Sequence, residues 1–136
     1  MGESIVLDTN ILFSALLREN SQWSRIILDS DHEFFICEST IIELFKHKEK
    51  LVKLSRLTEE ELIRWFYLLL RRAIVIKEDW IEPPARNRAC QLCRDVDPAD
   101  TPFVALAIHL DGLLWTGDKA LKSALEKKGF FSFFTS

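Results

Sequence analysis

The sequence predicts an α/β fold in which a central parallel sheet is flanked by helices. Short apolar runs alternate along the chain with longer segments in which apolar residues recur at helical spacing, as in parallel βαβ units. The apolar runs are continuous, which is typical of strands buried on both faces of a sheet. The 136 residues contain no repeat or long linker, and single cores commonly span about 100 to 150 residues. We therefore expect one domain that covers residues 1–136.

The predicted strands are the short apolar runs themselves. Four of them consist only of apolar residues, and an aromatic run near the C-terminus is a candidate for a fifth strand. We expect the first four to be buried on both faces, because none of them alternates with polar residues. In chain order, the five runs are residues 5–7, 34–37, 73–76, 113–115 and 130–134.

The segments between these runs carry helix start and stop signals. Thr58 and Glu61 form a capping-box pair ahead of apolar residues at helical spacing. Asp97-Pro98 opens a helix with a capping acid and a proline in the first turn, and Asp111-Gly112 ends it. Gly129 ends the last helix. Further helices are predicted over residues 10–18, 21–30, 40–54 and 85–94.

The net charge of the chain bears on whether it could bind nucleic acid, and in which way. Proteins that hold duplex DNA through many phosphate contacts are usually basic, because each contact releases counterions, whereas this chain has a formal charge of −3. A nuclease that relies on a bound cation can be acidic, since the metal supplies positive charge at the site. The charge therefore counts against a duplex-binding regulator more than against a metal-dependent nuclease.

The remaining composition indicates a cytoplasmic protein. A hydrophobic fraction of 48% fits a globular chain and argues against disorder. No run approaches the ~18 apolar residues of a membrane span, and Glu3 and Asp8 leave no room for a signal-peptide core. The three cysteines cannot complete a disulfide framework. We interpret Cys90 and Cys93, within one predicted helix, as small buried residues rather than zinc or redox ligands.

Four acidic residues fall at one rim of the predicted sheet. Asp8 directly follows the first strand, and Glu43 lies in the first turn of the helix after the second strand. Asp118 follows the fourth strand, where the last helix begins. Asp100 lies near the start of a helix that runs antiparallel to its following strand, which brings it to the same rim. Ligands of open parallel sheets bind beyond these carboxyl ends.

Carboxylates gathered in this way predict a site for a divalent cation. Like charges a few ångströms apart raise each other's pKa, so the cluster is destabilising when empty. Their hard oxygens suit Mg²⁺ or Mn²⁺. Such ions lower the pKa of a bound water and stabilise charge on a reacting phosphodiester. The expected reaction is therefore hydrolysis at phosphorus.

The segments around these acids resemble the PIN-domain family. They occur in the family's order across essentially the whole chain, and the set of four is more specific than any one of them. The segments are Val6-Leu7-Asp8-Thr9-Asn10, Thr40-Ile41-Ile42-Glu43-Leu44, residues 97–107 and Thr116-Gly117-Asp118-Lys119.

The resemblance implies a three-layer fold with a sheet ordered 3-2-1-4-5 and a metal-dependent endoribonuclease that hydrolyses single-stranded RNA. It implies that Asp8, Glu43, Asp100 and Asp118 bind the metal. Asn10 and Thr116 match positions that support the site. Because many small members are toxins of toxin–antitoxin pairs and form homodimers, the expected partners are RNA, an antitoxin and a second copy.

Several of these acids also admit a structural interpretation. Glu43 could complete a capping box with Thr40, and Asp118 could simply cap the last helix. Asp97 and Asp100 both compete for the role of third acid. Asp100 begins the segment that best fits the family pattern, whereas Asp97 is better placed as a cap that assists through a water. All three questions stay open at the level of sequence.

Basic residues crowd the helix that carries Glu43. Most such runs are solvated faces, but this one could guide an RNA backbone toward the metal. The candidate RNA-binding residues are Lys46, Lys48, Lys50 and Lys53. His47, in the same stretch, shows no ligand spacing and is interpreted as structural or solvent-facing.

Two other classes of function fit part of the pattern. One is a PIN-like module that binds RNA or protein without turnover, although the presence of all four acids counts against it. The other is a phosphoacceptor signalling domain, which gathers acids and Mg²⁺ at the same rim. That domain needs an Asp at the end of the third strand, where this chain has Ile76 followed by Lys77. A metal-dependent RNA-cleavage assay separates the three readings.

Overall fold

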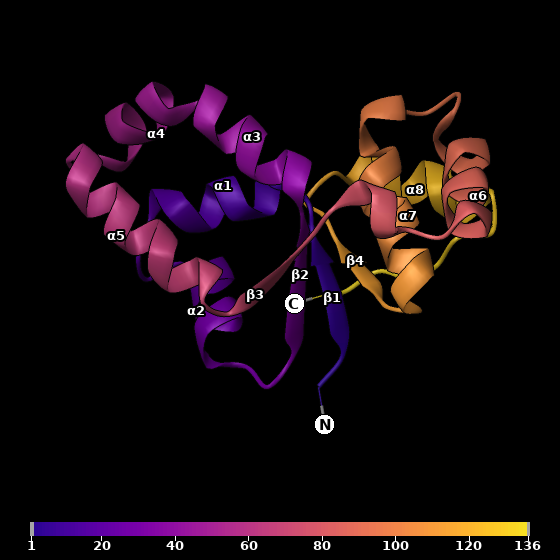
Figure 1. Ribbon diagram of the computed structural model, residues 1–136, viewed down its shortest axis with the longest axis horizontal. Helices are drawn as coiled ribbons and strands as arrows, with labels where there is room; N and C mark the ends of the chain where they lie inside the picture. Colours follow the sequence, from indigo (N-terminus) through magenta and orange to yellow (C-terminus); the bar gives the residue numbers. More distant parts are fainter. Residues whose placement is uncertain (1, 136) are drawn as a thin grey trace.

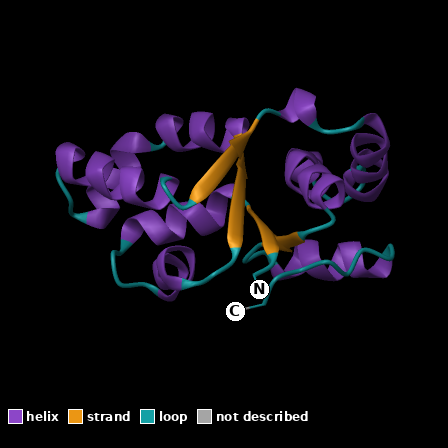
Figure 2. Cartoon of the chain, turned by 60° about the horizontal axis from the view of Figure 1, so that its bottom comes forward, coloured by secondary structure: helices purple, strands orange, loops and turns teal. Residues whose placement is uncertain are grey.

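The computed structural model describes residues 2–135 and contains a parallel sheet with the strand order β3-β2-β1-β4. Helices cover both of its faces, which gives the predicted three layers (Figures 1 and 2). The strands are β1 (Ser4–Leu7), β2 (Glu33–Cys37), β3 (Ala73–Ile76) and β4 (Leu113–Trp115). The predicted fold class is therefore confirmed.

Five helices lie on one side of the sheet and three on the other (Figure 1). The first group is α1 (Thr9–Leu17), α2 (Gln22–Asp29), α3 (Glu38–Lys46), α4 (Lys48–Ser55) and α5 (Glu59–Leu70). The second group is α6 (Pro83–Cys93), α7 (Thr101–Leu110) and α8 (Lys119–Lys127). Two short 3₁₀ turns, η1 (Glu78–Trp80) and η2 (Pro98–Asp100), precede α6 and α7. Within the described residues, none of the helices has the length and apolar character needed to cross a membrane.

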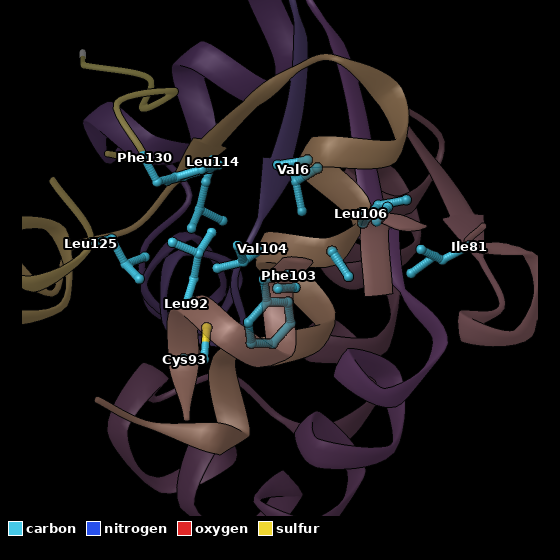
Figure 3. Close-up of a cluster of buried hydrophobic side chains, with 14 of the residues drawn as sticks. Val6, Ile81, Leu92, Cys93, Phe103, Val104, Leu106, Leu114, Leu125 and Phe130 are labelled. Atoms are coloured by element: carbon cyan, nitrogen blue, oxygen red, sulfur yellow. The ribbon is translucent and has the colours of Figure 1, made fainter. Parts of the chain in front are cut away.

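Each face of the sheet has its own hydrophobic core. Side chains alternate along β1, so Ile5 and Leu7 pack toward the first group of helices and Val6 toward the second. Figure 3 shows the second core, in which Val6 of β1 and Leu114 of β4 belong to one cluster with Leu106 of α7 and Leu92 of α6. Cys93 is buried in this core as expected, but Cys90 was expected to be buried and is exposed, because it lies just outside the buried stripe of α6 that Ala85, Ala89, Leu92 and Cys93 form.

The predicted fifth strand is reduced to a single bridge. Phe133 pairs with Leu114 in parallel, and the Leu114 amide donates to the Ser132 carbonyl at 2.8 Å. The Phe133 amide also donates to the Phe131 carbonyl at 2.9 Å. This three-residue turn bends the segment, so it lies beside β4 as expected but does not extend along it.

Two further predictions, on the helix over residues 40–54 and on the burial of the third strand, are wrong because tertiary packing overrides the local sequence pattern. The predicted helix over residues 40–54 is two helices, α3 and α4, which meet at His47 with φ −107° and ψ 19°. The break lets α4 turn and pack against α1. In β3, Ile74 and Val75 remain 47% and 42% exposed although the strand was expected to be buried on both faces. The reason is that β3 lies at the edge of the sheet.

Candidate active site at the carboxyl rim

Asp8 is the most buried acid of the rim, with 4% of its surface exposed. It directly follows β1 and caps α1, because its Oδ1 accepts a hydrogen bond from the Ile11 amide at 2.9 Å. Burial raises the pKa of Asp8, and the negative charge of Asp118 raises it further. Hydrogen bonds from the Thr116 hydroxyl and the Ile11 amide act in the opposite direction. The net effect is a raised pKa of Asp8, so the hydrogen bonds do not fully offset the cost of burying its negative charge.

Asp118 and Thr116 follow β4, the neighbour of β1. Asp118 caps α8, since its Oδ1 accepts from the Leu121 amide at 3.0 Å. The Thr116 hydroxyl oxygen accepts from the Asp118 amide at 3.1 Å and its proton is directed to Asp8. Thr116 therefore links the two acids. The capping role does not exclude a metal-binding one, because a carboxylate has about four lone-pair sites.

Asp100 is half-buried at the end of η2. Burial raises the pKa of Asp100 to about 6, together with the negative charges of Asp97, Asp8 and Asp118. A hydrogen bond with the Asp97 side chain adds to the shift. The Oδ1 atom of Asp97 also accepts from the Ala99 amide at 3.0 Å. Asp97 thus caps η2 and not α7, because the expected helix start is divided into a 3₁₀ turn and a helix.

Glu43 comes from a different part of the structure. Since α3 begins at Glu38, Glu43 lies in the second turn of the helix, and the sequence-based placement in the first turn is wrong. The capping box is wrong too, because the buried Thr40 hydroxyl accepts from the Thr9 hydroxyl at 3.4 Å. The Glu43 side chain is 50% exposed and its Oε2 lies 3.7 Å from Nε2 of His47.

A cavity of about 470 Å³ joins these elements. On one side it is lined by Asp8, Asp97 and Asp100, which we call the sheet wall, and on the other by Glu43, His47 and Lys50, which we call the helix wall. Asp118 stands beside the cavity and affects it through its charge. Within residues 2–135, no three acidic, histidine or cysteine side chains are grouped closely enough to hold a metal ion. A site formed by all four predicted acids therefore stays a prediction.

The helix wall also contains a residue that the sequence interpretation missed. His47 lines the cavity, and its spacing of four residues from Glu43 is the signal that could have placed the two on one face. Among the predicted lysines, Lys50 lines the cavity and lies 5.7 Å from the centre of the Phe13 ring. Lys48 instead pairs with Glu59 at 3.2 Å. Asn10 also lines the cavity, and its supporting role stays a prediction.

A second missed residue, Glu78, positions the helix wall. Its Oε1 accepts a hydrogen bond from the Ser39 amide at 3.1 Å, in the first turn of α3. Burial alone would raise the pKa of Glu78, but the Ser39 hydroxyl and amide lower it below its ordinary value. Glu78 follows β3 directly through Lys77, so the third strand holds the start of α3.

Comparisons with known proteins agree with this architecture. A family model described as "PIN domain" matches residues 6–128. The chain is similar to a chain of VapBC2 from Rickettsia felis, solved bound to a DNA fragment from the promoter, with 17% identity and a TM-score of 0.64 over 89% of this chain and 92% of that chain. It is also similar to PAE2754 from Pyrobaculum aerophilum, with 18% identity and a TM-score of 0.61 over 90% and 79% of the respective chains. No curated protein matches the chain.

Proposed function

Because the chain belongs to the PIN domain family, we propose that it is a metal-dependent endoribonuclease that cleaves single-stranded RNA. The observation that carries the proposal is that Asp8, Asp97 and Asp100 line one cavity, where burial, and then the negative charges of Asp97, Asp8 and Asp118, raise the pKa of Asp100. Carboxylates that repel one another in this way are suited to a divalent cation. No serine, cysteine or histidine triad competes for the same cavity among the residues that line it.

The donor set of the rim fits Mg²⁺ or Mn²⁺, because it consists of hard carboxylate oxygens. Asp8, Asp100 and Asp118 would hold the ion from the sheet side, and Glu43 would approach it from α3. When bound, the ion lowers the pKa of a water and neutralises charge on the phosphodiester. The same donor set argues against a phosphoacceptor domain, in which one carboxylate must stay free as a nucleophile.

The other residues of the cavity would orient these acids and the substrate. The Thr116 hydroxyl hydrogen-bonds the carboxylate of Asp8 and the backbone amide of Asp118, and would help to hold both residues in place. His47 and Lys50 place positive or neutral donors across the cavity from the acids, where they suit a phosphate group. The negative net charge supports a single strand held locally at this cavity and not a duplex held along its length.

Cleavage of a labelled single-stranded RNA tests the proposal directly. We expect cleavage with Mg²⁺ or Mn²⁺ and none with EDTA. Asp8→Asn should lower the rate by about a hundredfold or more, or about 2.7 kcal/mol in barrier height, while the cap on α1 is kept. Asp29→Asn, an exposed acid at the end of α2, is the matched control and should cleave normally. Equal activity of the Asp8 variant would remove Asp8 from the site, and a folded wild type without metal-dependent cleavage would support a silent binding module.

We further propose that the protein is the toxin of a toxin–antitoxin pair. This proposal rests on the similarity in fold to a chain of VapBC2. Expression of the wild type should then slow cell growth, and expression of Asp8→Asn should not. Co-expression of a small protein encoded beside it should restore growth. Normal growth with an RNA-cleaving wild type would contradict the toxin role and leave the nuclease role intact.

A further inference from the structure

A second polar pocket lies at the end of α1 that points away from the sheet. It encloses about 530 Å³ between the last turn of α1, the first turn of α2 and the loop that joins them, and we call it the α1–α2 pocket. Ser14, Arg18, Asn20, Gln22 and Trp23 contribute to its lining. Within the described part of the chain, no acidic residue lines this pocket. In contrast to the cavity at the carboxyl rim, it therefore suits an anionic ligand without a metal ion.

Ser24 holds the loop between α1 and α2 in place. Its side chain is fully buried, and its hydroxyl donates a hydrogen bond to the Glu19 carbonyl at 2.8 Å. The Ser24 amide donates to the hydroxyl oxygen of Ser21 at 3.1 Å, which caps α2. The backbone that carries Arg18 and Trp23 is thus fixed by interactions within the protein. A ligand of this pocket does not have to order the loop, so less binding energy is lost on ordering.

One face of α1 connects the α1–α2 pocket with the cavity at the carboxyl rim. Asn10 and Phe13 line the rim cavity, and Ser14 and Leu17 line the α1–α2 pocket. Their spacing of three, four and seven residues from Asn10 places all four on the same side of the helix. From the end of β1, α1 leads away from the sheet (Figure 1). The helix rises about 12 Å between Asn10 and Arg18, at about 1.5 Å per residue. A single strand covers this distance in about two to four nucleotides.

We propose that the α1–α2 pocket binds one nucleotide of the RNA strand whose scissile phosphate lies at the carboxyl rim. The partly buried Trp23 stacks on the base, and the exposed Arg18 contacts a phosphate. Within residues 2–135, the Arg18 side chain has no ion-pair partner, so its charge is available to the strand. Asn20 and Gln22, both exposed, add amide groups beside the nucleotide. The inference rests on the proposed nuclease function and adds a contact outside the catalytic site.

Fluorescence anisotropy with an adenosine RNA of about 12 nucleotides, with Ca²⁺ in place of Mg²⁺, tests the proposal. Trp23→Leu should raise the Kd by about tenfold, because leucine keeps an apolar contact with the core but cannot stack on a base. Arg18→Gln should raise it by about threefold, because one phosphate contact is lost. Circular dichroism and thermal melts establish that both variants fold, and Arg18→Gln changes only an exposed side chain.

Two matched controls separate this pocket from the rest of the surface. Trp80 is 70% exposed, Arg25 is exposed on α2, and neither lines the α1–α2 pocket or the rim cavity. Trp80→Leu and Arg25→Gln should bind the RNA like the wild type. The proposal is overturned if Trp23→Leu and Arg18→Gln both bind normally, or if the controls lose as much affinity as they do.

Photo-crosslinking locates the contact along the strand. One 5-iodouridine, which couples to a neighbouring aromatic side chain on irradiation, is placed at successive positions of the same RNA. Mass spectrometry should find the label on Trp23 when the iodouridine lies about two to four nucleotides from the bond that is cleaved with Mg²⁺. The label should disappear in Trp23→Leu. Labelling of Trp80 in place of Trp23, at every position tried, would contradict the proposal.

These outcomes are distinct from those that test the nuclease function. A wild type that cleaves RNA, combined with normal RNA binding by Trp23→Leu and Arg18→Gln, would refute the contact at the α1–α2 pocket and leave the nuclease function intact. A folded wild type that binds RNA through Trp23 but does not cleave it with any divalent cation would refute the nuclease function and leave the nucleotide contact in place.

Discussion

The two walls of the cavity are built on different parts of the fold. The acids of the sheet wall stand at a strand end and in a 3₁₀ turn, and both Asp8 and Asp97 are held by backbone amides. The helix wall lies on the second turn of α3 and across its break with α4. Its Glu43 and His47 are each 50% exposed and contact each other only at 3.7 Å.

The two walls therefore differ in how strongly the repulsion between their charged groups lowers the stability of the metal-free protein. In the sheet wall, burial, and then the negative charges of Asp97, Asp8 and Asp118, raise the pKa of Asp100. In the helix wall, the side chains of Glu43 and His47 are half exposed, so solvent screens the interaction between them. We therefore expect Asp100→Asn to change both activity and metal-free stability, and substitutions in the helix wall to change activity or substrate binding without changing metal-free stability.

The largest contrast is expected in catalysis. Asp100→Asn should lower the rate of RNA cleavage by about a hundredfold or more, because it removes a fixed charge from the proposed metal site. Glu43→Gln should lower it by only about tenfold, because the exposed side chain is less firmly placed. Single-turnover rates with saturating Mg²⁺ measure both. The distinction between the walls fails if the Glu43 variant loses as much activity as the Asp100 variant.

The free energy of unfolding of the metal-free protein should depend on pH because Asp100 has a raised pKa in the folded state. The folded pKa of about 6 exceeds the ordinary value of 3.8, so the folded protein retains a proton that the unfolded chain loses. The free energy of unfolding is then unaffected below about pH 4 and falls as the pH rises toward 6. The full shift corresponds to about 3 kcal/mol, which solvent screening of this half-exposed group reduces to roughly 1 kcal/mol.

Thermal melts in EDTA check this expectation. At pH 7.5 Asp100→Asn should melt roughly 3 °C above the wild type, and at pH 4 the two should agree. Mg²⁺ or Mn²⁺ should stabilise the wild type and have much less effect on the variant. Glu43→Gln should leave the metal-free melting temperature unchanged. A variant that melts lower in EDTA and gains as much from metal as the wild type would show that the acids form no shared site.

A smaller effect is expected from the positive charge of the helix wall. Lys50→Gln should weaken binding of single-stranded RNA by a few-fold, because one phosphate contact is lost. Lys53→Gln is the control, since Lys53 is exposed on α4 but does not line the cavity. Fluorescence anisotropy with Ca²⁺ in place of Mg²⁺ measures binding separately from cleavage. Equal losses in both variants would indicate a diffuse basic surface instead.

The smallest effect is expected at Asp97. Asn caps about as well as Asp, so Asp97→Asn should keep η2 in place and retain activity within about threefold. It should also reduce the pH dependence of stability, because one of the charges that raise the pKa of Asp100 is gone. If Asp97→Asn abolishes cleavage while Asp100→Asn preserves it, the roles of the two acids are reversed.

The acids of the sheet wall could be predicted from the sequence, because each is marked by a pattern in the residues next to it. Asp8 follows a continuous apolar run, and the end of such a run is the end of a strand. The same holds for Asp118 after β4. Asp100 required one more step, the tight turn at residues 111–112 that reverses the chain between α7 and β4.

The helix wall and the exposure of β3 could not be predicted from local sequence signals. The break at His47 has no glycine or proline to signal it and exists because α4 packs on α1. The exposure of Ile74 depends on which strand lies outermost, and an apolar run does not encode its place in the sheet. The single bridge at Phe133 likewise depends on a turn formed between its neighbours.

The caps formed by Asp8 and Asp118 have a consequence for how this protein can change by mutation. Both carboxylates hold the first turn of a helix through one oxygen, a task that asparagine performs equally well. One nucleotide change in the first codon position converts aspartate to asparagine. The proposed activity can therefore be lost in a single mutation while the folded protein and its surfaces persist. Inactive descendants of this gene should carry asparagine at these positions more often than alanine or glycine.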